Sequence, residues 1–276
     1  MNIIKRVANS IRYHFTKKIS DPFLLWCNLY RTLIITGADH SHYKTLVQWL
    51  VNMQNKMVRH KGVQIIVWDL GLKNEERMEL EKRFSKFCKF KTFDYSQHPP
   101  WFNISINAGE YAWKPAIIKA SLDLKSYSAK YLIWLDSGHL ITDLDEFSQL
   151  YPLLNDRHLY SPPSSGNIED WTHPKTLEYL KVDAQDINIR EQRNRSGGLL
   201  AFKISNSKVR ELICEFSLLA HEKECIAPEG SSRKNHRQDQ ALFTILYYQY
   251  IKQYMSQLYT NNSERYLGIT GHNDVD

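Results

Sequence analysis

The chain has 276 residues, of which 42% are hydrophobic and 24% are charged, and its formal net charge is +6. This composition is ordinary for a globular protein and excludes a chain that is disordered throughout. No apolar run approaches the roughly 20 residues that span a bilayer. The sequence also lacks a P-loop, a dinucleotide-binding fingerprint and a nucleophile elbow, which disfavours P-loop ATPases, dinucleotide oxidoreductases and α/β hydrolases.

The basic residues are dispersed, and their densest cluster lies in the first 20 residues, which argues against a nucleic-acid partner. Isoleucine, valine and phenylalanine recur there at helical spacing, so residues 1–29 are predicted to form a basic helical segment. Two interpretations stay open: residues 1–20 lie on an anionic membrane surface as a peripheral contact, or they form a solvated helix packed on the domain. Because the segment lacks the features of a signal peptide, we expect a cytoplasmic location.

From residue 30 onward, strand-like and helix-like patterns alternate in chain order. Apolar runs predict strands at 32–37, 64–70, 89–95, 130–136 and 197–204. Amphipathic spacing predicts helices at 43–57, 71–87, 113–124, 144–154, 209–220 and 240–254. Stretches rich in proline, glycine or polar residues predict loops at 98–111, 161–171, 185–198 and 229–240. The alternation predicts an α/β fold in one domain, residues 30–276, with a mostly parallel central sheet and helices on both faces.

Aspartates stand at or just after the ends of four predicted strands: Asp39, Asp69, Asp94 and Asp136. In parallel sheets ligands bind outside the carboxyl ends of the strands, so we expect some of these acids to face a ligand. Each could equally be a turn residue. Asp136 ends the most apolar strand, and the small Ser137 and Gly138 that follow let a ligand approach closely. A divalent cation that bridges Asp136 to a diphosphate would stabilise the ionised carboxylate.

Several segments resemble GT-A glycosyltransferases, especially the glycogenin-like ones. YLIWLDSGHLITDLDEF (131–147) resembles the segment around their metal-binding Asp-x-Asp. The segment YAWKPAIIKASLDL (111–124) resembles the aromatic and basic helix that precedes the metal-binding segment in that family. The segment NRSGGLLAFK (194–203) resembles the family's Asn-x-Gly strand, and HRQDQALFTIL (236–246) resembles its Asp-Gln helix start. GITGHN (268–273) resembles the C-terminal Gly-His segment. VWDLGL (67–72) and the Trp-Lys-Pro helix start are similar to nucleotide-diphospho-sugar transferase-like proteins. The resemblance covers roughly residues 30–273 and implies a GT-A, Rossmann-like fold.

The resemblance also implies an activity: transfer of a sugar, a hexose or a pentose, from a nucleotide diphosphate donor to a hydroxyl of a glycan acceptor. The expected donor is a UDP-sugar. The resemblance implies that Mn²⁺ or Mg²⁺, held by Asp136 and His272, assists the transfer. The donor would contact Asp39, Asp69, Lys114, Asp136, Ser137, Gly138, Gly197 and Gly198. Asp239 and Gln240 would be catalytic, with Asp239 deprotonating the acceptor if configuration inverts, or one of the two facing the departing sugar if it is retained.

The sequence departs from the family pattern at Gly138, which replaces the second acid of Asp-x-Asp. His139 is therefore an alternative ligand, and a metal-independent site with Lys114 or Arg195 on the diphosphate stays open. The loops at 96–110 and 161–196 are expected to shape the acceptor side, with Trp101, Trp171 and Arg195 as contacts.

Two other functions compete with the transferase. The cluster Asp39, His40 and His42 has the residue types of a zinc site and could serve a metal-dependent phosphoesterase. The missing second acid is also compatible with a non-catalytic nucleotide-sugar-binding protein that kept the fold.

Overall fold

The structure, a computed structural model, describes residues 31–58, 60, 62–124, 128–182, 187–255 and 267–271. The predicted N-terminal helical segment, residues 1–29, and the predicted metal ligand His272 lie outside the described residues. Within the described part, no helix is both long and apolar enough to cross a membrane.

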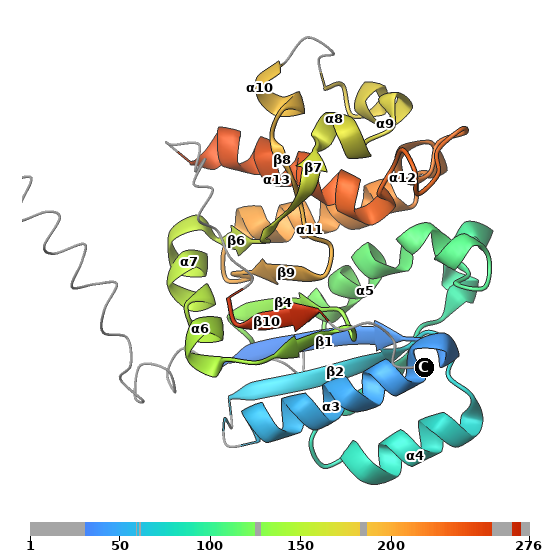
Figure 1. Cartoon of the computed structure of the whole chain (residues 1–276), viewed down its shortest axis with the longest axis vertical. Helices are drawn as coiled ribbons and strands as arrows, with labels where there is room; N and C mark the ends of the chain where they lie inside the picture. Colours follow the sequence, from blue (N-terminus) through green and yellow to red (C-terminus); the bar gives the residue numbers. More distant parts are fainter. Residues whose placement is uncertain are drawn as a thin grey trace, which may run out of the picture.

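A six-stranded sheet forms the centre of the molecule, in the order β3-β2-β1-β4-β9-β6 (Figure 1). Its strands are β1 (Thr32–Ala38), β2 (Val63–Asp69), β3 (Lys89–Thr92), β4 (Tyr131–Leu135), β6 (Leu159–Tyr160) and β9 (Leu199–Phe202). Strands β1 to β4 are mutually parallel, whereas β9 runs antiparallel to both β4 and β6. The expected α/β fold with a mostly parallel sheet between helices is confirmed.

Two hydrophobic layers cover the two faces of the sheet. Because side chains alternate along a strand, Leu33 and Ile35 of β1 point into one buried cluster and Ile34 into the other. The first cluster packs under α5 (Trp113–Leu122), α11 (Ser207–Ala220) and α13 (Gln238–Tyr254). The second packs under α3 (Tyr43–Met57), α4 (Asn74–Phe84), α6 (Leu144–Ser148) and α7 (Leu150–Arg157). Figure 1 shows α3 and α4 on the side of the sheet opposite to α5 and α11.

Four elements pair or fold in a way that the sequence patterns do not predict. Strand β5 (His139–Ile141) pairs antiparallel with β10 (Ile269–Gly271), and β7 (Pro163–Asn167) pairs antiparallel with β8 (Arg193–Arg195). The segments 161–171 and 185–198 were expected to be loops, because strand β7 is made of proline, serines, a glycine and an asparagine and has no apolar alternation. Its pairing depends on a partner strand far away in the sequence.

Short helical turns complete the connections. They are η1 (His40–His42), η2 (Tyr95–Gln97), η3 (Pro100–Phe102), η4 (Asn107–Tyr111), α8 (Ile168–Trp171), α9 (Pro174–Tyr179), α10 (Ile187–Arg190) and α12 (Lys223–Ile226). The helix predicted at 144–154 divides at Gln149 into α6 and α7.

The strand order places a ligand site between β1 and β4. The chain proceeds from β1 through β2 to β3 on one side, and then returns to form β4 on the other side of β1. At such a reversal the connections leave adjacent strands in opposite directions, which opens a crevice at their carboxyl ends. Asp39 directly follows β1 and Asp136 directly follows β4, so both acids lie at this crevice.

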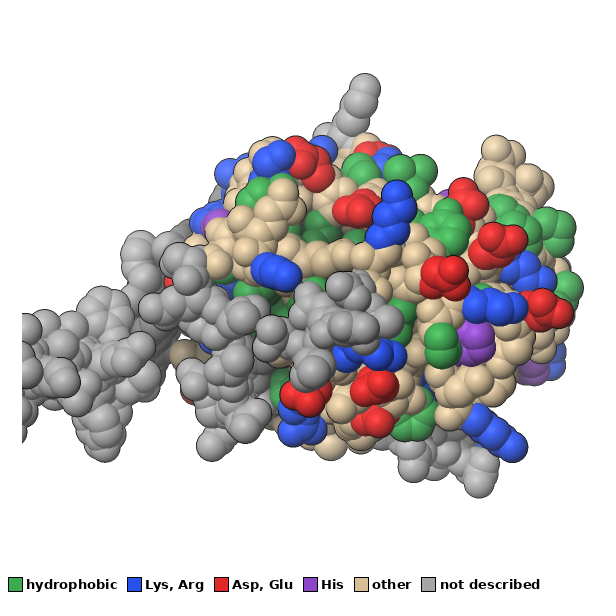
Figure 2. Space-filling model, turned by 90° about the horizontal axis from the view of Figure 1, so that it is seen from above, with side chains coloured by type: hydrophobic (Ala, Val, Ile, Leu, Met, Phe, Trp, Pro, Cys, Tyr) green, Lys and Arg blue, Asp and Glu red, His purple; other side chains and the backbone are tan. Residues whose placement is uncertain are grey.

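Charges of both signs are interspersed on the face that Figure 2 shows, where Lys and Arg alternate with Asp and Glu. The expectation that nucleic acid is not a partner stays a prediction.

Candidate functional site

A cavity of about 760 Å³ occupies the crevice at the ends of β1 and β4. Its volume is in the range of small-molecule and cofactor sites. Of the residues predicted to bind a donor or to be catalytic, the cavity is lined by Asp39, Lys114, Asp136, Ser137, Gly138, Gly197, Gly198, Asp239 and Gln240. Residues from the first turns of α5 and α13 thus meet residues that follow β1 and β4.

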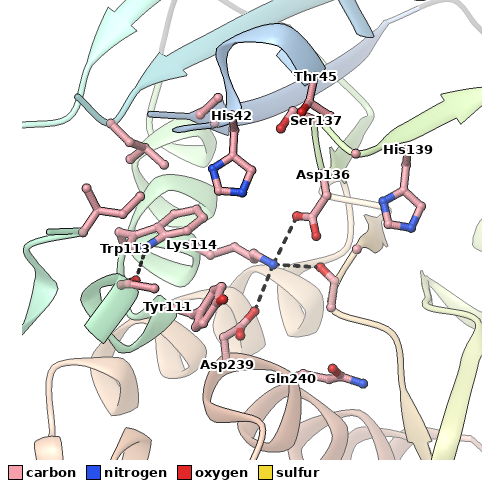
Figure 3. A pocket seen from close by; sticks show the side chains of 18 of the residues that line it. His42, Thr45, Tyr111, Trp113, Lys114, Asp136, Ser137, His139, Asp239 and Gln240 are labelled. Atoms are coloured by element: carbon pink, nitrogen blue, oxygen red, sulfur yellow. Dashed lines mark hydrogen bonds and ion pairs between the residues drawn. The ribbon is translucent and has the colours of Figure 1, made fainter. Parts of the chain in front are cut away.

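Lys114 lies at the centre of this site (Figure 3). Its Nζ is 3.2 Å from Asp136 Oδ1 and 3.2 Å from Asp239 Oδ2, and it donates a hydrogen bond of 3.1 Å to the Gly197 carbonyl. The Nζ also lies 5.4 Å from the centre of the Trp134 ring. Lys114 and Asp239 are each only 4% exposed. One ammonium therefore holds two carboxylates together, and the three side chains carry a net charge of −1.

Burial and charge act against each other on these groups. Burial lowers the pKa of Lys114, but the carboxylates of Asp136 and Asp239 outweigh it, and the pKa is raised above its usual value. Lys114 is thus a permanent cation. Burial raises the pKa of Asp239, and the attraction of Lys114 does not fully compensate for it. Asp239 is therefore a stronger base than an exposed aspartate, which is a property that proton abstraction requires.

The side chain of Asp136 is more accessible than that of Asp239, at 34% against 6% exposure. Trp134 Nε1 donates a hydrogen bond of 2.6 Å to Asp136 Oδ1, and the Asp136 amide donates to the Gly198 carbonyl at 2.9 Å. The buried strand β4 supplies Trp134, so the strand itself fixes the direction of the carboxylate that follows it. This explains why an acid is stable at the end of an apolar strand.

Two glycines are required by close packing around the ion cluster. A Cβ on Gly197 would lie 3.3 Å from Asp239 Oδ2 and 3.6 Å from Lys114 Nζ. A Cβ on Gly198 would lie 2.3 Å from Cε1 of His139, whose ring covers this glycine. His139 lines the cavity as well. The Gly-Gly pair lets the backbone just before β9 approach Lys114 closely enough for the Gly197 carbonyl to accept a hydrogen bond.

At the β1 end of the cavity, Asp39 accepts hydrogen bonds from neighbouring side chains. Ser41 Oγ donates to Asp39 Oδ1 at 2.8 Å, and His42 Nδ1 lies 2.6 Å from the same oxygen. Burial acts to raise the pKa of Asp39, but these hydrogen bonds outweigh it and lower the pKa below its usual value. The carboxylate is therefore held ionised and oriented, as an acceptor for sugar hydroxyls or a base amide would be.

A left-handed turn shortly before Lys114 in the chain contributes to the cavity wall. In η4 the residues from Asn107 to Tyr111 have φ between 47° and 63°. Such a conformation costs roughly 1–2 kcal/mol for each residue other than glycine. Trp113 Nε1 donates to the Ala108 carbonyl at 3.0 Å and stabilises the turn. A Cβ on Gly109 would lie 2.3 Å from the Phe102 carbonyl oxygen, so only glycine fits there. Ala108 and Tyr111 line the cavity.

Asp69 lies outside the cavity lining, although it was predicted to contact the donor. Its Oδ1 accepts hydrogen bonds from the amides of Gly71 and Leu72, at 2.9 and 2.8 Å, and its Oδ2 pairs with Arg77 at 3.2 Å. The carboxylate thus orders the turn after β2. Asp94 does the same after β3, where it accepts from the Ser96 amide. A direct contact between Asp69 and a donor stays a prediction.

The three predicted acceptor contacts are not among the described residues that line the cavity. Trp101 packs beside the first hydrophobic cluster, with Lys223 Nζ 6.0 Å from its ring centre. Arg195 is 4% exposed and donates to the Ser161 carbonyl and the Tyr248 hydroxyl. Trp171 lies under the guanidinium of Arg237, 3.9 Å from ring centre to Cζ. Arg237 does line the cavity, so Trp171 is connected to it through one residue.

The histidines of the predicted zinc cluster have different partners. His40 Nδ1 lies 2.7 Å from Glu76 Oε1, while His42 bonds Asp39. Within the described ranges, no group of three or more His, Cys, Asp or Glu residues could hold a metal ion. This separation disfavours a zinc phosphoesterase at Asp39, His40 and His42.

The same test applies to the metal expected at the diphosphate. Of its two predicted ligands, the described chain contains only Asp136, whose Oδ1 already accepts from Trp134 and lies 3.2 Å from Lys114 Nζ. The described residues by themselves do not form a divalent-cation site. Lys114 places a positive charge beside the carboxylate.

Among the cavity-lining residues that sequence patterns missed are Tyr111, Ser164, Arg233 and Arg237. Tyr111 lies in the left-handed turn, and Ser164 lies in β7, which was expected to be a loop. The two arginines belong to the segment RKNHRQDQ, where the signal available was the basic cluster just before Asp239.

Comparison with known proteins agrees with this architecture. No protein-family model matches the sequence, and no curated protein matches it. Among solved structures, galactosyltransferase LgtC in complex with donor and acceptor sugar analogs is similar, with a TM-score of 0.52, 16% identity, and coverage of 87% of this chain and 86% of that one.

Two further glycosyltransferases are less similar. Core-mannan synthase A from Aspergillus fumigatus, in its Mn/GDP form, has a TM-score of 0.44 and 9% identity, with coverage of 78% of this chain and 69% of that one. Mouse xyloside xylosyltransferase 1 has a TM-score of 0.46 and 10% identity, with coverage of 79% of this chain and 80% of that one. These two similarities are too weak to support an argument. Over most of its length, the chain has the fold of GT-A glycosyltransferases.

Proposed function

We propose that the protein is a glycosyltransferase that moves one sugar from a nucleotide diphosphate donor, a UDP-sugar, to a hydroxyl group of a glycan acceptor. The observation that carries this proposal is the convergence of Lys114, Asp136 and Asp239 in the cavity where the strand order of a GT-A sheet reverses. In this proposal the donor extends from Asp39, beside the base and ribose, to Lys114, beside the diphosphate.

Sugar transfer breaks the anomeric C–O bond and leaves the bonding electrons on the diphosphate. A cation fixed beside the leaving oxygen stabilises this charge without reorganisation. Lys114 supplies such a cation, because Asp136, Asp239 and the Gly197 carbonyl hold its ammonium in place. We also propose that Asp136 and His272 would hold Mn²⁺ or Mg²⁺, which would add positive charge beside the diphosphate. The metal dependence of UDP binding measures this contribution.

Asp239 is the proposed catalytic carboxylate. It is buried, its pKa is raised, and it lies in the first turn of α13, where the helix dipole favours its ionised form. In an inverting reaction it removes the proton of the acceptor hydroxyl. In a retaining reaction Asp239 or Gln240 faces the departing sugar. The anomeric configuration of the product, read by NMR, distinguishes the two.

Calorimetric titration with UDP and GDP, with and without Mn²⁺, tests the proposal. The wild type and the control Asp156→Asn, an exposed aspartate of α7, should bind UDP, while Asp136→Asn should bind it at least about tenfold more weakly. Release of UDP from a panel of UDP-sugars then measures turnover. Failure of the wild type to bind either nucleotide contradicts the proposal.

Binding without turnover of any donor would favour the second candidate, a non-catalytic nucleotide-sugar-binding protein. The observation that favours it is Gly138, which leaves the strand end with one acid.

A further inference from the structure

Two arginines face the cavity without a carboxylate partner. Arg233 and Arg237 both line it, and neither forms an ion pair with any Asp or Glu in the part of the chain that the structure describes. Other arginines do find acids, such as Arg77 with Asp69 and Arg190 with Glu169. The exposed Arg233 and the half-buried Arg237 therefore have guanidinium groups available to an anionic ligand in the cavity.

Both guanidinium groups lie over aromatic rings. The Cζ of Arg237 lies 3.9 Å from the centre of the Trp171 ring, and that of Arg233 lies 4.8 Å from the centre of the Tyr111 ring. A guanidinium over an aromatic ring still has its N–H groups at its edge, where they form paired hydrogen bonds to phosphate or carboxylate oxygens. The rings thus support the two side chains without using their hydrogen-bond donors.

The segment that carries the arginines is itself fixed. The Arg237 amide donates to the Trp171 carbonyl at 3.1 Å. The buried His236 accepts from the His173 amide at 3.1 Å, and its Nε2 donates to the Ile226 carbonyl at 2.9 Å. The arginines are thus built on a rigid backbone, as a binding site requires.

The two arginines act on each other and on the catalytic carboxylate. Burial lowers the pKa of Arg237, and the charge of Arg233 lowers it further. Arg233 also lowers the pKa of Asp239, although burial dominates there. The pair is therefore a positive region in the same cavity as the three-residue cluster at Lys114, which itself carries a net charge of −1.

We propose that Arg233 and Arg237 form an oxyanion subsite for the acceptor, so that the sugar accepting the transfer carries a phosphate or carboxylate group. This inference rests on the transferase function proposed above. A neutral glycan has no need of two unpaired arginines, whereas an anionic one would be repelled by Asp136, Asp239 and the donor diphosphate unless cations faced it. Lys114 lies beside the proposed diphosphate position, which leaves the arginines, from the segment before α13, for the acceptor.

Calorimetry with four sugars tests the subsite: glucose 6-phosphate and galacturonate, against glucose and galactose. At low salt the wild type should bind the charged sugars at least about tenfold more tightly than the neutral ones. Arg233→Gln with Arg237→Gln should reduce this preference to less than about threefold, with the larger share from the more buried Arg237. Arg210→Gln, an exposed arginine of α11 away from the cavity, should retain it. Should the double variant fail to fold, the single variant at the exposed Arg233 should still show a reduced preference.

Three results overturn the subsite: equal binding of charged and neutral sugars, a preference that persists in the arginine variants, or displacement of glucose 6-phosphate by saturating UDP. The last result would assign the arginines to the donor diphosphate. UDP is titrated separately into every variant. Normal UDP binding with no preference for charged sugars refutes only the anionic acceptor, whereas a wild type that binds no nucleotide refutes the transferase and the acceptor assignment together.

Discussion

Replacing Lys114 by methionine should cost about 3–5 kcal/mol of unfolding free energy, since breaking a buried ion pair leaves an uncompensated charge. At an effective dielectric constant near 20, an ammonium 3.2 Å from a carboxylate contributes about 5 kcal/mol of attraction, before desolvation is subtracted. Lys114 makes two such contacts. Methionine keeps the length and apolar volume of the side chain, so the loss reports the charge rather than a cavity.

The cost should depend on pH in a defined direction. Without the ammonium, Asp239 is buried close to a second negative charge, and its pKa rises further above the unfolded value. A carboxyl group with a raised folded-state pKa stabilises the fold at low pH and loses that contribution as the pH rises through the folded pKa. The variant should therefore approach the wild type near pH 5 and differ most at pH 8, in urea titrations followed by tryptophan fluorescence with EDTA present.

A double-mutant cycle separates the pair from general damage. Asp239→Asn combined with Lys114→Met removes the buried negative charge as well, so the double variant should be at least about 2 kcal/mol more stable than the sum of the single losses predicts. Additive losses, or a Lys114→Met cost below about 1 kcal/mol, would refute the buried ion cluster as the element that organises the site.

Three other changes test the surroundings of the cluster. Gly198→Ala forces a Cβ against the ring of His139 and should cost about 1–3 kcal/mol by urea titration, with most of the loss recovered when His139→Ala is added. Trp134→Phe removes the hydrogen bond to Asp136 and should weaken UDP binding about tenfold by calorimetry; unchanged affinity would show that the strand does not orient this carboxylate. His236 is buried and its pKa is lowered to about 4, mainly by burial. The neutral His236 contributes to the unfolding free energy above pH 6.5, and this contribution is lost as the pH falls through 4. The unfolding free energy of the wild type should therefore fall by about 3 kcal/mol between pH 6.5 and pH 4, and that of His236→Gln should fall by less.

The sheet could be predicted because its strands carry their own signal. Strands β1, β2 and β4 are rich in buried apolar residues, and the predicted strands 32–37, 64–70 and 130–136 end within one residue of the observed strand ends. Burial on both faces of the sheet demands this composition whatever the rest of the chain does. The positions of Asp39 and Asp136 follow directly, since each comes immediately after one of the strands that the order of the sheet brings together.

The outer wall of the site could not be predicted in this way. Strand β7 is polar and is held by β8, so its conformation comes from pairing rather than from its own residues. The sequence of the left-handed turn at Asn107–Tyr111 predicts a different conformation, because four of its five residues are not glycine and disfavour positive φ. Contacts from outside the turn stabilise it, such as the hydrogen bonds from Trp113 Nε1 to the Ala108 carbonyl and from Gln238 Nε2 to Glu110 Oε2.

The charge balance of the site links two features that the sequence showed separately, Gly138 and Lys114. Asp136 and Asp239 share one ammonium, so the cluster carries a charge of −1 before a donor binds. A second acid at position 138 would make this charge −2 in a cavity that must also receive a diphosphate. With glycine there, the cluster holds one positive charge beside the proposed leaving group, and Arg233 and Arg237 add two more to the same cavity. The replaced acid thus makes the cavity better suited to anionic ligands.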